Sequence, residues 1–152
     1  MTATVAESVD ALRSMVGADL GHSGWREVSQ EMIHGFADAT HDHQWIHVDV
    51  ERAKSGPFGG PVAHGYLTLS LLVPLLNELL EVRGCSLAIN YGCNRVRFPA
   101  PVPAGSRVRL GAVLKQAEDV AGGVQVVIDA TVEVEGGSKP VCVAEAIYRY
   151  HR

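Results

Sequence analysis

The sequence predicts an α+β fold in which one long apolar helix is wrapped by a curved antiparallel β-sheet. The segment that begins at Tyr66, YLTLSLLVPLLNELLEV, is apolar on almost every face, so a helix formed by it must be buried on every face. After residue 84 the chain alternates apolar and polar residues in stretches separated by turn residues. A sheet that curls around the helix would bury both sets of apolar side chains.

The length and composition indicate one globular domain. The chain has 152 residues, enough to bury its own core, and 47% of them are hydrophobic while 20% are charged. A net charge of −4 without a basic run argues against binding to nucleic acid or to an acidic membrane surface. The cysteines, Cys85, Cys93 and Cys142, have no CxxC spacing, which argues against a disulfide framework or a zinc site and favours the cytoplasm.

The chain carries no pattern typical of secretion or of membrane insertion. Its N-terminus is acidic and lacks the basic and apolar regions of a signal peptide. The longest apolar stretch, Tyr66 to Leu80, is too short to span a membrane. From the length of the chain we expect residues 1–152 to form a single domain, with residues 1–24 as an N-terminal extension packed on it.

The N-terminal half is predicted to contain short helices. Ser29 is a suitable N-cap because Glu31 follows in the first turn, and Asp49 is expected to cap a second, shorter helix. In chain order the predicted elements are a helix at about 5–16, a strand at 25–28, a helix at 30–39, the short helix after residue 49 and a loop rich in Gly and Pro at 55–65.

The second half is predicted to contain the central helix and the main strands. The helix should run for about 15 residues, with a kink at Pro74, which lacks an N–H group. The predicted strands are 87–98, 107–116, 124–134 and 141–150, in an antiparallel meander. One small sheet cannot cover all faces of the helix, which favours a homodimer, although the short helices of residues 5–53 could also cover it.

Candidate catalytic residues lie in two segments, FADATHDHQWIHVDVERA (36–53) and AHGY (63–66). Asp42 and His47 are five residues apart, so the chain must turn between them if both face one pocket. A carboxylate and an imidazole that converge on one water can activate it at neutral pH. The N–H of Gly65, at a helix start, could stabilise a developing oxyanion. These three groups would suit addition of water to, or its removal from, an activated acyl group.

Other roles for the same residues remain open at this point. The spacing of His41, His43 and His47 matches no helix-face pair such as HExxH, so we predict no metal. Asp42 could be only a turn residue at the end of a helix. His64 could be a buried histidine that hydrogen-bonds to the backbone.

Both segments resemble the MaoC-like dehydratase, or (R)-specific enoyl-CoA hydratase, family. Its motif has an aromatic and a small residue, Gly-Asp-x-Asn-Pro-(Leu/Ile)-His and another small residue. Matching positions here are Phe36, Asp42, Ile46, His47 and Ala53. Further matches are the Ala-His-Gly of residues 63–65 and NYGCNRVRFPAPVPAGSRVR (90–109), which resembles the family's Arg-Phe-x-x-Pro-Val strand and turn. The likeness is greatest to the small single-domain branch that includes nodulation-protein-N-like members.

Two departures from the motif stand next to the acid–base residues. His41 replaces the Gly, so if that position needs a positive φ, His41 must adopt a left-handed backbone. Gln44 and Trp45 replace the Asn-Pro pair, and Trp45 could shape the wall of the pocket.

The resemblance implies a hotdog fold, paired into dimers, and reversible syn hydration of a trans-2-enoyl thioester to an (R)-3-hydroxyacyl thioester. Asp42 and His47 would hold the water, one taking its proton and the other protonating the α-carbon. The Gly65 N–H would bind the thioester oxygen. No metal or redox cofactor is implied, and CoA is part of the substrate. Candidate substrate-binding residues are Trp45, Phe58, His64, Tyr66, Asn90, Arg95 and Arg97, of which the arginines suit CoA phosphates but could equally be exposed strand residues.

Two other functions are compatible with the same fold. A hotdog thioesterase would need a carboxylate on the central helix, but Glu78, the only acid between Gly65 and Leu80, lies near the far end. A non-catalytic acyl-binding or partner subunit is favoured by His41, whereas the presence of both Asp42 and His47 argues against it.

Overall fold

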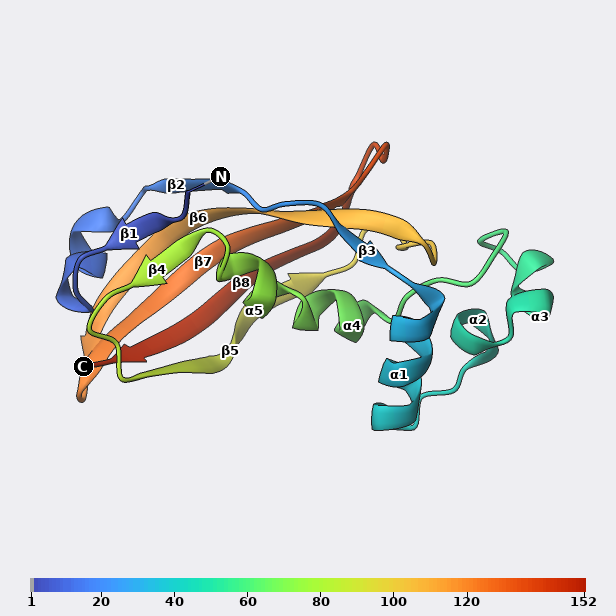
Figure 1. Ribbon diagram of the computed structural model, residues 1–152, viewed down its shortest axis with the longest axis horizontal. Coiled ribbons are helices and arrows are strands. Elements are labelled where there is room, and N and C mark those ends of the chain that lie inside the picture. The colour runs from blue at the N-terminus through green and yellow to red at the C-terminus, as the bar shows by residue number, and fades with distance from the viewer. Residues whose placement is uncertain (1) are drawn as a thin grey trace.

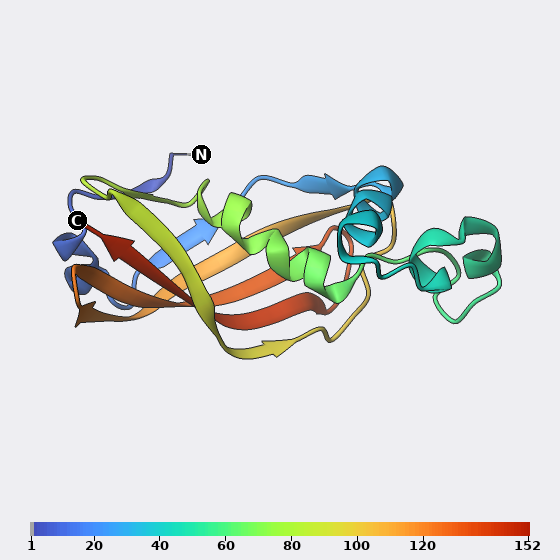
Figure 2. The same ribbon diagram turned by 90° about the horizontal axis from the view of Figure 1, so that it is seen from below.

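A computed structural model describes residues 2–152 as a curved antiparallel sheet with a helix lying across its concave face (Figures 1 and 2). The sheet order is β2-β6-β7-β8-β5, and β3 also pairs with β6. This arrangement confirms the predicted α+β class. The strands of this sheet are β2 Asp19–His22, β3 Arg26–Val28, β5 Leu87–Arg97, β6 Ser106–Val120, β7 Gly123–Val134 and β8 Pro140–His151.

The predicted meander is correct for β6, β7 and β8 but wrong for β5. Strands β6 to β8 are joined in sequence and pair antiparallel, whereas β5 pairs with β8 at the opposite edge from β6. The connection at 98–105 contains three prolines and is longer than the two to five residues of a usual hairpin loop. It crosses the end of the sheet, where Pro103 forms a bridge with Val62, before the chain enters β6.

The central helix is shorter than predicted and is divided at Leu71. Helix α4 covers Gly65–Ser70 and α5 covers Leu72–Leu76, after which the chain turns into β4, Leu80–Val82. Strand β4 pairs parallel with β1, Thr4–Ala6. This pairing explains why the last residues of the apolar segment form a strand and do not continue the helix.

The expectation that this helix is buried on every face is also wrong for the single chain. Leu67, Leu72 and Leu75 pack into the core, whereas the side chain of Tyr66 is 71% exposed and Val73 is 37% exposed. The uncovered face lies away from the concave surface of the sheet (Figure 2).

The N-terminal helix predicted at 5–16 is replaced by β1 and a short 3₁₀ helix, η1, Asp10–Met15. Val9 and Leu12 are nevertheless buried, whereas Val16 is 49% exposed, so the apolar pattern marked only some of the inward-facing side chains. Strand β2 then joins the main sheet by pairing with β6.

The two predicted caps are confirmed. Ser29 Oγ accepts a hydrogen bond from the Met32 N–H at 3.1 Å and starts α1, Gln30–Thr40. The Asp49 carboxylate accepts from the Arg52 N–H at 3.0 Å and starts α3, Val50–Lys54, immediately after α2, Trp45–Val48. Helices α2 and α3 project beyond one end of the sheet, and α1 lies at that end (Figures 1 and 2).

The core lies between the concave face of the sheet and the central helix. Its fully buried members include Val108, Leu110, Leu114, Ile128 and Leu75, each stabilising the fold by about 1.5–3 kcal/mol through burial. All three cysteines are free thiols. Within residues 2–152 no helix is both long enough and apolar enough to cross a membrane.

Candidate active site

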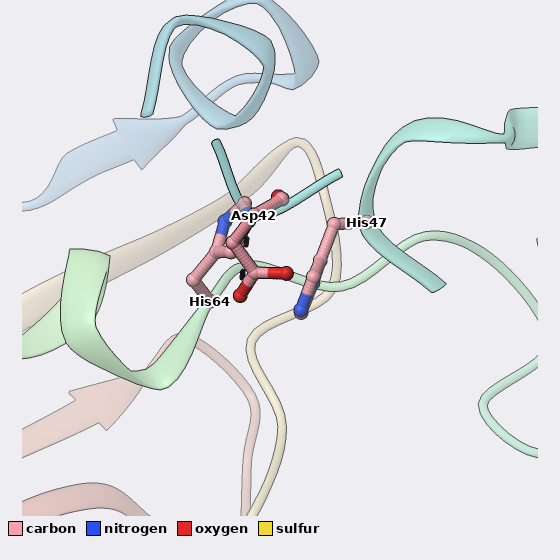
Figure 3. A group of neighbouring side chains, drawn as sticks. All are labelled: Asp42, His47 and His64. Carbon is pink, nitrogen blue, oxygen red and sulfur yellow. Dashed lines mark hydrogen bonds and ion pairs between the residues drawn. The ribbon is translucent and has the colours of Figure 1, made fainter. Parts of the chain in front are cut away.

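Three ionisable side chains meet where the loop after α1, helix α2 and the start of α4 converge (Figure 3). One nitrogen or oxygen of each of Asp42, His47 and His64 lies within 4.8 Å of the others. The two imidazoles are buried, whereas the Asp42 side chain is 55% exposed. A solvent-accessible carboxylate therefore lies above two imidazoles that the protein shields from water.

The turn that brings Asp42 to this position depends on His41. His41 ends α1 with φ 62° and ψ 19° and is, among the described residues, the only one other than Gly with a positive φ. His41 thus has the left-handed backbone that was expected for this position if its φ were positive. Such a conformation costs about 1–2 kcal/mol for a residue with a Cβ atom. It reverses the chain direction, so that Asp42 and the next helix face the same region.

His47 is fixed in one tautomer by its backbone partner. Its Nδ1 lies 2.6 Å from the carbonyl oxygen of Val62, so Nδ1 carries the proton and Nε2 keeps its lone pair. Gln30 Nε2 donates to the His47 carbonyl at 2.8 Å and holds the backbone of α2. Burial lowers the pKa of His47, and the adjacent His64 lowers it further, while Asp42 and the Val62 bond oppose the shift. His47 is therefore neutral at pH 7.

His64 links the other two residues. Its Nε2 lies 2.9 Å from the backbone carbonyl of Asp42 and 4.0 Å from the Asp42 carboxylate, and its ring stacks on His47 with centroids 3.8 Å apart. Because a carbonyl can only accept, this Nε2 carries the proton. In this neutral ring the lone pair is on Nδ1, which is buried and has no hydrogen-bond partner among the described residues.

A cavity of about 330 Å³ opens beside this group and is mostly apolar. An added Cβ on Gly65 would lie 2.9 Å from the Phe98 ring, so glycine allows the aromatic ring to cover the helix start. The lining residues are Ile46, His47, Phe58, Val62, Ala63, Gly65, Thr68, Phe98, Pro99, Ala100, Pro101, Val102 and Val141.

Of the residues predicted to contact substrate near the helix, Phe58 lines the cavity and two aromatic residues do not. The Trp45 ring lies under the Arg52 guanidinium at 4.4 Å and is in close contact with Gly56. Tyr66 is exposed and meets Phe98 edge to face at 6.2 Å. Trp45 lies in α2 and Tyr66 in α4, and neither is on the face of its short helix that lines the cavity.

The three strand residues predicted to contact substrate also lie elsewhere in the single chain. Val96 packs against the core, so Arg95 and Arg97 project from the outer face of the sheet, where they line a separate hollow. Asn90 lines another hollow, beside the central helix. Glu78, the acid that a thioesterase would need, is instead held by the Gly24 N–H at 3.0 Å and by Arg26 at 3.0 Å.

Sequence reasoning missed three residues that shape the site. Gln30 holds the His47 backbone, Phe98 covers Gly65, and the buried Thr68 lines the cavity. Of these three, only Thr68 could have been found from the sequence, because it is three residues after Gly65 and so lies on the same face of the helix.

Comparison with known proteins agrees with this fold. The model of the MaoC like domain family matches residues 12–136. The chain is similar to 3-hydroxyacyl-thioester dehydratase Z of Mycobacterium tuberculosis, 56% identical over 145 residues that cover 95% of this chain and 96% of that protein. It is also similar to Nodulation protein N of Rhizobium meliloti, 46% identical over 143 residues that cover 92% of this chain and 89% of the relative.

Solved structures confirm the hotdog architecture that the resemblance implied. The R-hydratase PhaJ1 from Pseudomonas aeruginosa superposes with a TM-score of 0.75 and 22% sequence identity, over 97% of this chain and 87% of that one. At this identity the likeness supports the fold.

Proposed function

The chain belongs to the MaoC-like dehydratase family, and from this premise we propose that it adds water reversibly and syn to trans-2-enoyl-CoA, giving (R)-3-hydroxyacyl-CoA. Its dehydratase relatives support a hydro-lyase. The strongest support in the chain itself is the meeting of the Asp42 carboxylate and the neutral His47 imidazole beside an apolar cavity. His47 lines that cavity and has a nitrogen within 4.8 Å of an Asp42 oxygen, so an acyl chain there would place its reactive carbons beside His47.

In the proposed reaction Asp42 and His47 hold the water through an ionised carboxylate and the free Nε2 lone pair. The water oxygen bonds to C3 of the enoyl group while the water gives up one proton. One proton reaches C2, and the Asp–His pair ends with the protonation it had at the start. The Val62 carbonyl keeps the His47 ring oriented throughout.

The negative charge that develops on the thioester oxygen needs a hydrogen-bond donor. The Gly65 N–H, at the first residue of α4 and in the cavity wall, is the proposed donor. A reaction of this kind needs no resident metal or redox cofactor, and CoA enters as part of the substrate.

The proposal is tested by the loss of enoyl-thioester absorbance with crotonyl-CoA and with a longer trans-2-enoyl-CoA. The matched variant is Asp42→Asn, whose side chain has the same size. Asp42 is largely exposed and accepts only a long 3.4 Å bond from the Gln44 N–H, so the variant should fold. We expect its kcat to fall by about 10²–10⁴-fold. A folded native protein that consumes neither substrate would favour a non-catalytic acyl-binding subunit, and release of free thiol would favour a thioesterase.

We further propose a homodimer that forms along β5. This strand pairs with β8 on one side only, and Leu87, Ile89 and Tyr91 expose 37–55% of their area. An unpaired strand edge with exposed apolar side chains favours pairing with another strand. A second copy would extend the sheet across both chains and cover the exposed side of the central helix. We place the protein in the cytoplasm, where its free thiols would persist.

A further inference from the structure

His64 has contacts that a substrate-binding residue does not need. The side chain is 3% exposed, and its only hydrogen bond in the described chain uses Nε2 to reach the Asp42 backbone carbonyl. One face of its ring stacks on His47, and Phe36 packs against it with centroids 4.8 Å apart. The imidazole therefore touches both acid–base residues and is itself enclosed.

The loop that carries Asp42 has few other restraints. It follows the left-handed residue His41, and its other side-chain hydrogen bonds are the His43–Asp38 pair at 2.8 Å and the long 3.4 Å bond from the Gln44 N–H to Asp42. Both members of that pair are largely exposed, and exposed ion pairs contribute little to stability. The 2.9 Å bond from the buried His64 ring to the Asp42 carbonyl is thus the shortest hydrogen bond that holds Asp42 itself.

His47 is restrained by three neighbours. Val62 fixes its ring through Nδ1, Gln30 holds its backbone, and His64 limits the tilt of its ring by stacking. His64 is the only one of these neighbours that also contacts Asp42. Moving this one side chain would change the separation of the carboxylate and the imidazole.

From these contacts we infer that His64 is a positioning residue, which sets the distance and angle between Asp42 and His47 rather than binding substrate. The inference rests on the proposed hydration. A misplacement of about 1 Å at a reacting group can cost about 10²-fold in rate. The hydrogen bond to the Asp42 carbonyl needs a side chain with a donor at the position of Nε2, but that side chain does not have to be charged.

Three substitutions separate this role from simple packing. His64→Gln places an amide nitrogen three bonds beyond Cβ, where Nε2 stands. His64→Asn places its nitrogen one bond too short, and His64→Leu fills the space without a donor. With crotonyl-CoA we expect kcat to fall at least tenfold in the Leu and Asn variants, with KM within threefold of the native value. We expect the Gln variant to stay within threefold of the native kcat.

A control and a second readout complete the test. His43→Gln removes the exposed pair and should change kcat less than twofold. Backbone ¹⁵N–{¹H} NOE values at Asp42 and His43 report the mobility of the loop without any substrate. They should fall in the Leu and Asn variants and remain native in the Gln variant.

Two outcomes would overturn the inference. One is a Leu variant with native kcat and native NOE values, and the other is a Gln variant as impaired as the Leu variant. A native protein without hydratase activity would refute the proposed function alone, because the NOE series still decides whether His64 restrains the loop.

Discussion

Replacing Gly65 with alanine should destabilise the protein through a steric conflict with Phe98. An ideal Cβ at position 65 would lie 2.9, 2.9 and 3.1 Å from three atoms of the Phe98 ring, whereas ordinary contacts begin at 3.4 Å. The ring would have to move by about 0.5 Å, and Tyr66 packs against its edge. Overpacking of this size costs about 1–3 kcal/mol.

Urea unfolding at one fixed protein concentration measures this cost, with Gly35→Ala as the matched control. Gly35 lies in α1, and an added Cβ there would meet no atom within 4 Å. Alanine is the better helix former by about 0.8–1 kcal/mol, so the control should be more stable than the native protein. The two Gly→Ala changes should therefore shift stability in opposite directions.

A double variant identifies the cause of the loss. In the Phe98→Ala background the ring is absent, so Gly65→Ala should then cost nothing further. Equal costs in both backgrounds would refute the steric argument, as would a Gly65→Ala protein as stable as the Gly35→Ala control. Because Phe98 also lines the cavity, we expect the Gly65→Ala variant to hydrate crotonyl-CoA more slowly than the native protein.

Three further predictions concern titration, assembly and capping. Burial lowers the pKa of His47 below its ordinary value of 6.5 in the folded protein. As the pH falls, the His47 imidazole is therefore protonated in the unfolded chain before it is protonated in the folded one. The free energy of unfolding is thus highest above pH 6.5 and decreases as the pH falls from 6.5 through the pKa of His47 in the folded state. The urea midpoint of the native protein should be lower at pH 5.5 than at pH 8. This decrease should be smaller for His47→Asn, because asparagine has no proton to bind. Ile89→Lys should convert the proposed dimer to a monomer in light scattering, and an unchanged mass would exclude β5 as the interface. Ser29→Ala removes the bond to the Met32 N–H and should cost about 1 kcal/mol in the same urea assay, whereas no loss would show that water replaces the cap.

Much of the site could be predicted because its residues carry local signals. Asp42, His47 and Gly65 stand at motif positions, and the structure brings the first two together and puts Gly65 in the adjoining cavity wall. The direction of each neighbouring side chain could not be predicted in this way. Trp45 and Tyr66 are two residues and one residue from key positions, yet neither lines the cavity, because the inward face of a short helix is decided by what packs against it.

The same division applies to the strands and helices. The sequence alone determined the two caps at Ser29 and Asp49 and the alternation of β6, β7 and β8, because these features depend on neighbours a few residues away. Only the tertiary structure decided that β5 pairs with β8 and that the apolar run ends as a strand beside β1. It also decided that His64 meets the Asp42 carbonyl, 22 residues away. Such contacts form between distant segments, whose pairing follows from the packing of the whole chain and not from local residue preference.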